Sequence, residues 1–175
     1  MTISEALLAE FQQEARTTRK FLERVPDEKL AWKPHPKSMS AGQLALHIAV
    51  APGQVMQIAT ADEVPVPNFD RLNPEPKSKQ EVLAALDESI ATVQKVLPTL
   101  TEERMQAVWR MKAGDKEVLA MPRAAFLRNI LLNHWYHHRG QLGVYLRLLG
   151  AKVPSSYGPS GDEPPEFLQE RPAGA

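Results

Sequence analysis

The sequence predicts an all-α fold, a four-helix bundle joined by long connections. Four segments carry apolar residues three and four positions apart, which is typical of helices that bury one face. Proline-bearing stretches separate these segments, and 15 of the 175 residues are proline. The chain has no internal repeat and is long enough for one hydrophobic core. We therefore expect a single domain over residues 1–163 and a flexible tail over residues 164–175.

The first helix is predicted to run from Ser4 to about Arg24, where Pro26 ends it. The connection that follows contains Trp32, a large aromatic residue that we expect to plug one end of the bundle.

The second helix is predicted to begin at Ser40. Its hydroxyl can accept from the third helical amide, and Gln43 at that position can reach back in a capping box. Pro52 should kink or distort this helix, which continues to about Thr60. Residues 62–77 contain four prolines and no sustained periodicity, so we expect a surface connection there.

The third helix is predicted from Ser78, with Glu81 repeating the capping-box spacing, to Pro98. A short helical turn can follow at Thr101. Between Met105 and Met121 the pattern is compatible with either an irregular crossover or a small hairpin.

The fourth helix is predicted from Pro122, as its first helical residue, to Leu149, with Gly150 as a left-handed stop. Residues three and four apart on this segment should face the core together. They are Leu127, Ile130, Leu131, His134, His138, Gln141, Leu142, Tyr145 and Leu149.

His134 and His138 stand four residues apart on this face, where helical Cβ atoms are about 5–6 Å from each other. Two imidazoles so placed can converge on one ion. His47 occupies an apolar face of the second helix and is the candidate third ligand, or else a hydrogen-bonded core histidine. His35 lies between two prolines outside any helix, and His137 should face outward.

The composition excludes several classes of protein. There are 21 basic and 21 acidic residues without a long run of either sign, so the basic patch of a nucleic-acid binder is not expected. No apolar run approaches the roughly 20 residues of a membrane span, and the N-terminus lacks a cationic signal-peptide start. We expect a cytoplasmic protein. The absence of cysteine excludes disulfides, thiolate ligands and a protein-borne thiol nucleophile.

Three features together resemble the DinB family, the damage-inducible, YfiT-like group regarded as metalloenzymes. They are His47 in a Ser-capped helix, the run His134-Trp135-Tyr136-His137-His138-Arg139-Gly140-Gln141, and the tail Val153-Pro154-Ser155-Ser156-Tyr157-Gly158-Pro159-Ser160. The resemblance implies a homodimer and one divalent ion held by His47, His134 and His138. Relatives in the same superfamily include mycothiol-dependent maleylpyruvate isomerase and the bacillithiol S-transferases.

These relatives imply an S-transferase that joins a low-molecular-weight bacterial thiol to an electrophilic small molecule. The physical argument agrees, because three neutral imidazoles leave the full charge of the ion available to acidify a bound thiol or water. A metal-dependent hydrolase uses the same ligands but needs a carboxylate or histidine as proton acceptor. A non-catalytic, metal-stapled protein would need a fourth ligand, such as His35 or a carboxylate from residues 62–77. Imidazole ligands suit zinc, nickel and iron alike.

Overall fold

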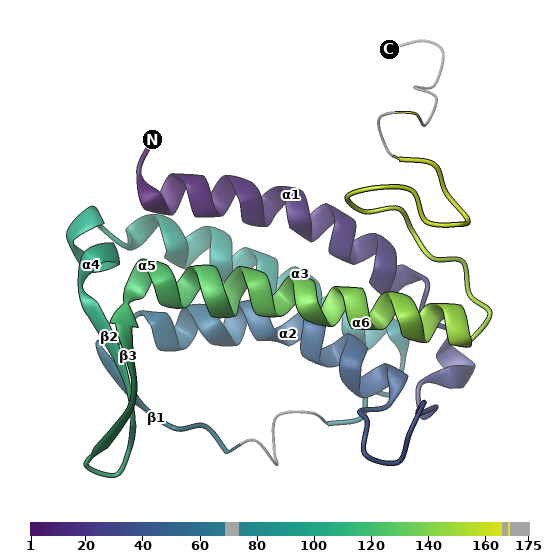
Figure 1. Ribbon diagram of the computed structural model, residues 1–175, viewed down its shortest axis with the longest axis horizontal. Coiled ribbons are helices and arrows are strands. Elements are labelled where there is room, and N and C mark those ends of the chain that lie inside the picture. Colours follow the sequence, from purple (N-terminus) through teal and green to yellow (C-terminus); the bar gives the residue numbers. More distant parts are fainter. Residues whose placement is uncertain (69–73, 166–167, 169–175) are drawn as a thin grey trace.

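The computed structural model describes residues 1–68, 74–165 and 168, and its long helices lie side by side (Figure 1). Helix α1 packs on α3 and α6, and α2 packs on the same two helices. The bounds of the long helices are α1 Ile3–Glu23, α2 Ala41–Ala59, α3 Lys79–Val96 and α6 His134–Leu148. Shorter helical segments are Asp27–Lys29, Leu97–Thr99, α4 Glu102–Gln106, α5 Arg123–Phe126 and the π-helical Leu127–Asn133. The protein is thus mostly helical, as expected.

The helices begin where polar side chains bind their first amides. Helix α1 begins at a capping box formed by Thr2 and Glu5, slightly before the predicted start. In α2 the predicted box is present, since Ser40 Oγ accepts from the Gln43 amide at 3.0 Å and Gln43 Oε1 accepts from the Ser40 amide at 2.9 Å. Ser78 caps α3 as predicted.

A small three-stranded sheet corrects the all-α prediction. Its strands β1 (Glu63–Pro65), β2 (Val108–Ala113) and β3 (Lys116–Pro122) are ordered β1-β2-β3. Strands β2 and β3 form the small hairpin that the sequence left open, with Gly114 at φ 60° in its turn. Strand β1 pairs in parallel with β2 and places Glu63 opposite Arg110. This strand lies in a connection where regular structure was not expected, because its pairing partner is distant in sequence.

The last long helix is not one continuous α-helix. Pro122 ends β3 and is the N-cap of α5, so its predicted place as the first helical residue is wrong by one position. A π-helical stretch, Leu127–Asn133, then separates α5 from α6. Gly150, at φ 72°, follows the end of the helix as predicted.

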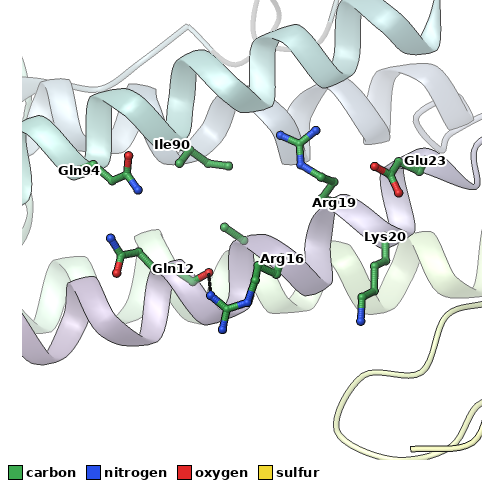
Figure 2. Close-up of a pocket in the computed structure, with 8 residues that line it drawn as sticks. Gln12, Arg16, Arg19, Lys20, Glu23, Ile90 and Gln94 are labelled. Atoms are coloured by element: carbon green, nitrogen blue, oxygen red, sulfur yellow. Dashed lines mark hydrogen bonds between the residues drawn. The ribbon is translucent and has the colours of Figure 1, made fainter. Parts of the chain in front are cut away.

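The core lies between the long helices and extends to the sheet. Trp109 and Trp135 are its largest fully buried side chains, and Trp135 stacks on Phe11 with ring centroids 5.0 Å apart. Trp32 is only partly buried, and it packs edge-on against Tyr145 near the end of α6. A cavity of about 450 Å³ lies between α1 and α3 (Figure 2).

The expectation of a loose tail over residues 164–175 falls mostly on residues 166–167 and 169–175, outside the described residues. Within the described part of the chain, no helix is both long enough and apolar enough to span a bilayer.

Candidate metal centre

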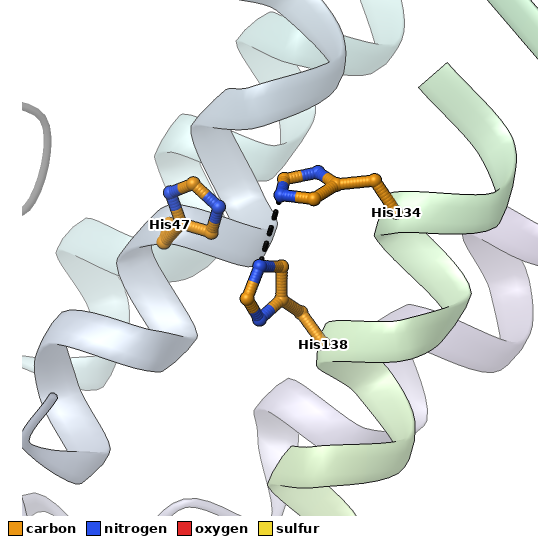
Figure 3. Close-up of side chains that lie close together, drawn as sticks. All are labelled: His47, His134 and His138. Carbon is orange, nitrogen blue, oxygen red and sulfur yellow. Dashed lines mark hydrogen bonds between the residues drawn. The ribbon is translucent and has the colours of Figure 1, made fainter. Parts of the chain in front are cut away.

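His47, His134 and His138 lie close together between α2 and α6 (Figure 3). Helical spacing predicted that His134 and His138 share a face, and His47 was the candidate third member. Their candidate ligand atoms all lie within 4.8 Å of one another. The ring of His47 is nearly perpendicular to both others, with centroids 5.3 Å from His134 and 4.7 Å from His138. All three side chains are half-buried, and both ring nitrogens of His47 are themselves buried.

A proline inside α2 helps to set the distance between the two helices. Because Pro52 has no amide hydrogen, the carbonyl of Ile48 lacks its usual helical donor. The indole of Trp135 replaces it, and Nε1 donates to the Ile48 carbonyl over 2.8 Å. Ile48 follows His47 and Trp135 follows His134, so this bond joins the helices directly beside the histidines.

The hydroxyl of Ser89, on α3, binds the main chain of α2 beside Pro52. It accepts from the Gly53 amide at 3.1 Å and donates to the Val50 carbonyl at 3.2 Å. A Cβ at position 53 would lie 2.8 Å from this hydroxyl, so only glycine allows α3 to approach so closely. Helix α2 thus continues through Pro52 from Ala41 to Ala59, and side chains of α6 and α3 bind its main chain on either side of the proline.

Burial favours the neutral form of His134 and His138. It lowers the pKa of His134 from 6.5 to about 4, and the neighbouring His138 and His137 lower it further. Burial also lowers the pKa of His138, although the hydrogen bond to Gln141 opposes that shift. A neutral imidazole is the form that binds a metal ion.

The spacing of His134 and His138 is compatible with a shared divalent ion. His134 Nε2 and His138 Nε2 are 3.0 Å apart. Two nitrogens that share one zinc ion, each about 2.1 Å from it, lie within about 4.2 Å of each other. Nδ1 of His138 lies 3.0 Å from Gln141 Oε1, so the amide can hold the ring with Nε2 turned toward the cluster. The three histidines could therefore hold a metal ion.

A fourth protein ligand is not found among the described residues. His35 lies elsewhere, exposed, where its Nδ1 accepts from the Lys37 amide at 3.2 Å. His137 is exposed as predicted and stays outside the cluster, although its ring centroid is 5.0 Å from that of His138. In the described part of residues 62–77, no carboxylate joins the three histidines.

Arg139 does not belong to this cluster. Its side chain is 3% exposed and pairs with Glu14 of α1 at 2.6 Å. The hydroxyl of Tyr157 bridges the two, accepting from Arg139 at 2.8 Å and donating to Glu14 at 2.9 Å. This buried pair ties α6 to α1 and to the folded-back tail. No local spacing in the sequence identified Glu14 as the partner of Arg139.

Comparison with known proteins agrees with the fold. The family model described as the DinB family matches residues 1–170. The protein named "Uncharacterized protein YrdA" of Bacillus subtilis (strain 168) is 29% identical over 172 residues, which cover 94% of each chain.

Solved structures share the architecture. A DinB-like protein from Bacillus cereus ATCC 10987 has a TM-score of 0.69 at 25% identity, covering 87% of this chain and 97% of that one. The DinB-like protein YjoA from Bacillus subtilis has a TM-score of 0.65 at 20% identity, covering 87% and 96%. Since the family model extends over nearly the whole sequence, this chain belongs to the DinB family.

Proposed function

We propose that this protein is a metal-dependent S-transferase that joins a low-molecular-weight bacterial thiol to an electrophilic small molecule. In this proposal His47, His134 and His138 hold one divalent ion, which is zinc, nickel or iron. The observation that carries it is the convergence of three half-buried imidazoles from two helices, with no fourth protein ligand among the described residues. Structural zinc sites are normally closed by four protein ligands, whereas reactive sites keep a position open.

The roles of the chain's own residues follow from their contacts. Gln141 orients His138, and Trp135 holds the backbone of α6 against α2 beside the cluster. Burial lowers the pKa of His134 and of His138, which favours the unprotonated form that binds a metal ion. When bound, a divalent ion lowers the pKa of a thiol or water that it coordinates and so supplies a nucleophile near pH 7.

The reaction balances without any group from a cysteine. The thiol gives its proton to solvent, and a sulfur electron pair forms the new bond to the electrophilic carbon. The leaving group departs with the electrons of the broken bond. A chain without cysteine has no internal thiol to compete for the ion.

Hydrolysis is the second candidate, and His137 is the observation that favours it. The exposed His137 ring lies beside His138, where it could accept a proton from an activated water. Thiol transfer is preferred because no carboxylate joins the cluster in the described part of the chain. The two reactions differ in their need for His137.

The test is a thioether-forming assay on metal-loaded protein. Monochlorobimane serves as the electrophile, and mycothiol, bacillithiol and free cysteine are offered as separate thiols. We expect metal-dependent product with one of these thiols, loss in His138→Ala and retention in His137→Ala. Turnover of ester or amide substrates that is lost in His137→Ala, with no thiol transfer, would instead favour the hydrolase. Absence of both activities from protein with a full metal load would contradict both assignments.

A further inference from the structure

The groove between α1 and α3 has the chemistry of a second ligand site, separate from the histidines. Its volume of about 450 Å³ lies within the range of small-molecule pockets. Helices α1 and α3 form one side of the helix assembly, whereas the histidines lie between α2 and α6. An occupant of the groove therefore does not contact the metal centre, and nothing in this inference depends on the proposed reaction.

Positive charge is concentrated in this groove although the whole chain has no net charge. Three of its lining residues are cationic, Arg16, Arg19 and Lys20, against one carboxylate, Glu23. All four lie on α1, within two turns of the helix.

The two arginines differ in how far their charge is already neutralised. Arg19 pairs with Asp87 of α3, whose side chain is 63% exposed. Arg16 donates to the main-chain carbonyl of Gln12 at 3.3 Å and forms no ion pair with any residue that the structure describes. A guanidinium binds carboxylate or phosphate oxygens through paired N–H groups, so Arg16 remains available to an anion.

The rest of the lining suits the organic part of such an anion. Ala15 and Ile90 supply apolar surface between the helices. Figure 2 shows Gln12 and Gln94 across from each other at one end of the groove, while Lys20 and Glu23 lie at the other. A few polar groups at the ends of an apolar surface are typical of sites that bind small organic molecules.

We propose that the α1–α3 groove binds a small organic anion, through a carboxylate or phosphate group held by Arg16 and Arg19 and an apolar body over Ala15 and Ile90. Carboxylate and phosphate groups both accept paired N–H groups from a guanidinium, so either head group fits the proposal. Phenyl phosphate and benzoate are suitable probes, since each joins one head group to an aromatic ring and neither is a strong metal chelator.

The test is isothermal titration of each probe into the full-length protein. We expect saturable binding of one molecule per chain, with a Kd of about 1 mM or tighter. Arg16→Gln and Arg19→Gln should each weaken it by about tenfold, because each removes a charge-assisted contact. Glutamine is also a good helix former, so both variants should fold. A preference between the probes identifies the head group.

Two controls separate a site from a general charge effect. Arg110→Gln removes one positive charge from the hairpin, where Arg110 pairs with Glu117, and should leave the Kd unchanged. His138→Ala should also leave it unchanged, because the histidines lie on the other side. No saturable binding, or equal weakening by Arg110→Gln, would overturn the proposal. The proposal would also be overturned if light scattering showed a dimer that dissociates only in the Arg16 and Arg19 variants. A second copy of the chain would then occupy the groove.

Discussion

Each ring nitrogen of His138 has a neighbour that defines its role. Gln141 Oε1 lies 3.0 Å from Nδ1, and His134 Nε2 lies 3.0 Å from Nε2. An amide oxygen only accepts, so Nδ1 carries the proton and Nε2 turns its lone pair toward the cluster. Helical spacing predicted that these three residues share a face. It could not decide whether Gln141 orients a ligand or bonds to the backbone, because that depends on a rotamer.

Replacing Gln141 tests this orienting contact. Gln141→Ala should weaken metal affinity by about 10-fold to 100-fold, because the His138 ring loses the acceptor that fixes it. Gln141→Glu should restore the affinity, since a carboxylate accepts the same proton. Affinity is measured by competition with a chelator of known strength. Gln54→Ala, an exposed glutamine on α2, is the matched control. Equal affinity in Gln141→Ala and the wild type would show that the contact is incidental.

Arg139 and Glu14 present a different case, a buried charge pair with a structural role. Their side chains are 3% and 7% exposed. Removing one partner leaves the other charge buried and unpaired, so Arg139→Ala should destabilise the fold by about 3–5 kcal/mol. Metal stoichiometry should stay unchanged in the protein that remains folded.

Urea denaturation measures this cost, and a surface pair provides the comparison. Arg147 pairs with Asp162 at 2.7 Å, and the Arg147 side chain is 53% exposed. Arg147→Ala should cost about 0–1 kcal/mol. If the two arginine variants lose similar stability, the buried pair does not hold α1, α6 and the tail together as described.

At the scale of elements, the contact between α2 and α6 decides where the histidines meet. Pro52 removes one main-chain donor, and Trp135 supplies the replacement to the Ile48 carbonyl. The sequence predicted both helices because local spacing specifies them, and the chemistry of proline leaves the Ile48 carbonyl without its helical donor. The partner of the released carbonyl lies 87 residues away in sequence, beyond what local patterns specify.

A double-mutant cycle tests this contact. Trp135→Phe removes the indole donor and should cost about 1–3 kcal/mol, because the buried Ile48 carbonyl is left unsatisfied. In a Pro52→Ala background the cost should be smaller, since an alanine amide can donate to the same carbonyl. Thermal or urea denaturation measures the free energy of unfolding of the wild type, the two single variants and the double variant.

Trp109 provides the matched control for the cycle. Its Nε1 donates to the Ile58 carbonyl at 3.2 Å, which does not involve Pro52. Trp109→Phe should therefore cost the same with and without Pro52→Ala. Strict additivity of Trp135→Phe and Pro52→Ala would refute the replacement of one donor by the other.

Other elements show where sequence patterns reach their limit. The four long helices and the β2–β3 hairpin follow from local periodicity and turn residues. Strand β1 is only three residues long and exists by pairing with β2, more than 40 residues further on. The apolar residues of the π-helical segment before His134 still recur three and four positions apart, as in an α-helix. The sequence therefore predicted one uninterrupted α-helix.

At the scale of the whole molecule, the proposed ion would link α2 to α6, two helices far apart in sequence. A ligand that binds only the folded state stabilises it, by about 2.7 kcal/mol at a free concentration 100 times its Kd. Adding metal to stripped protein should therefore raise the Tm, and a chelator should lower it again. Scanning calorimetry measures the shift.

The variants decide whether this stabilisation arises at the histidines. The metal-dependent shift in Tm should vanish in His47→Ala and His138→Ala and persist in His137→Ala. An equal shift in all of them would assign the effect to a different site.

The most direct measurement is the metal content of protein purified without an affinity tag, determined by elemental mass spectrometry. The wild type and His137→Ala should each carry about one metal ion per chain, and His47→Ala, His134→Ala and His138→Ala should each lose it. A metal-free wild type that also fails to take up zinc, nickel or iron would contradict the three-histidine centre. So would loss of metal in His137→Ala with retention in His138→Ala.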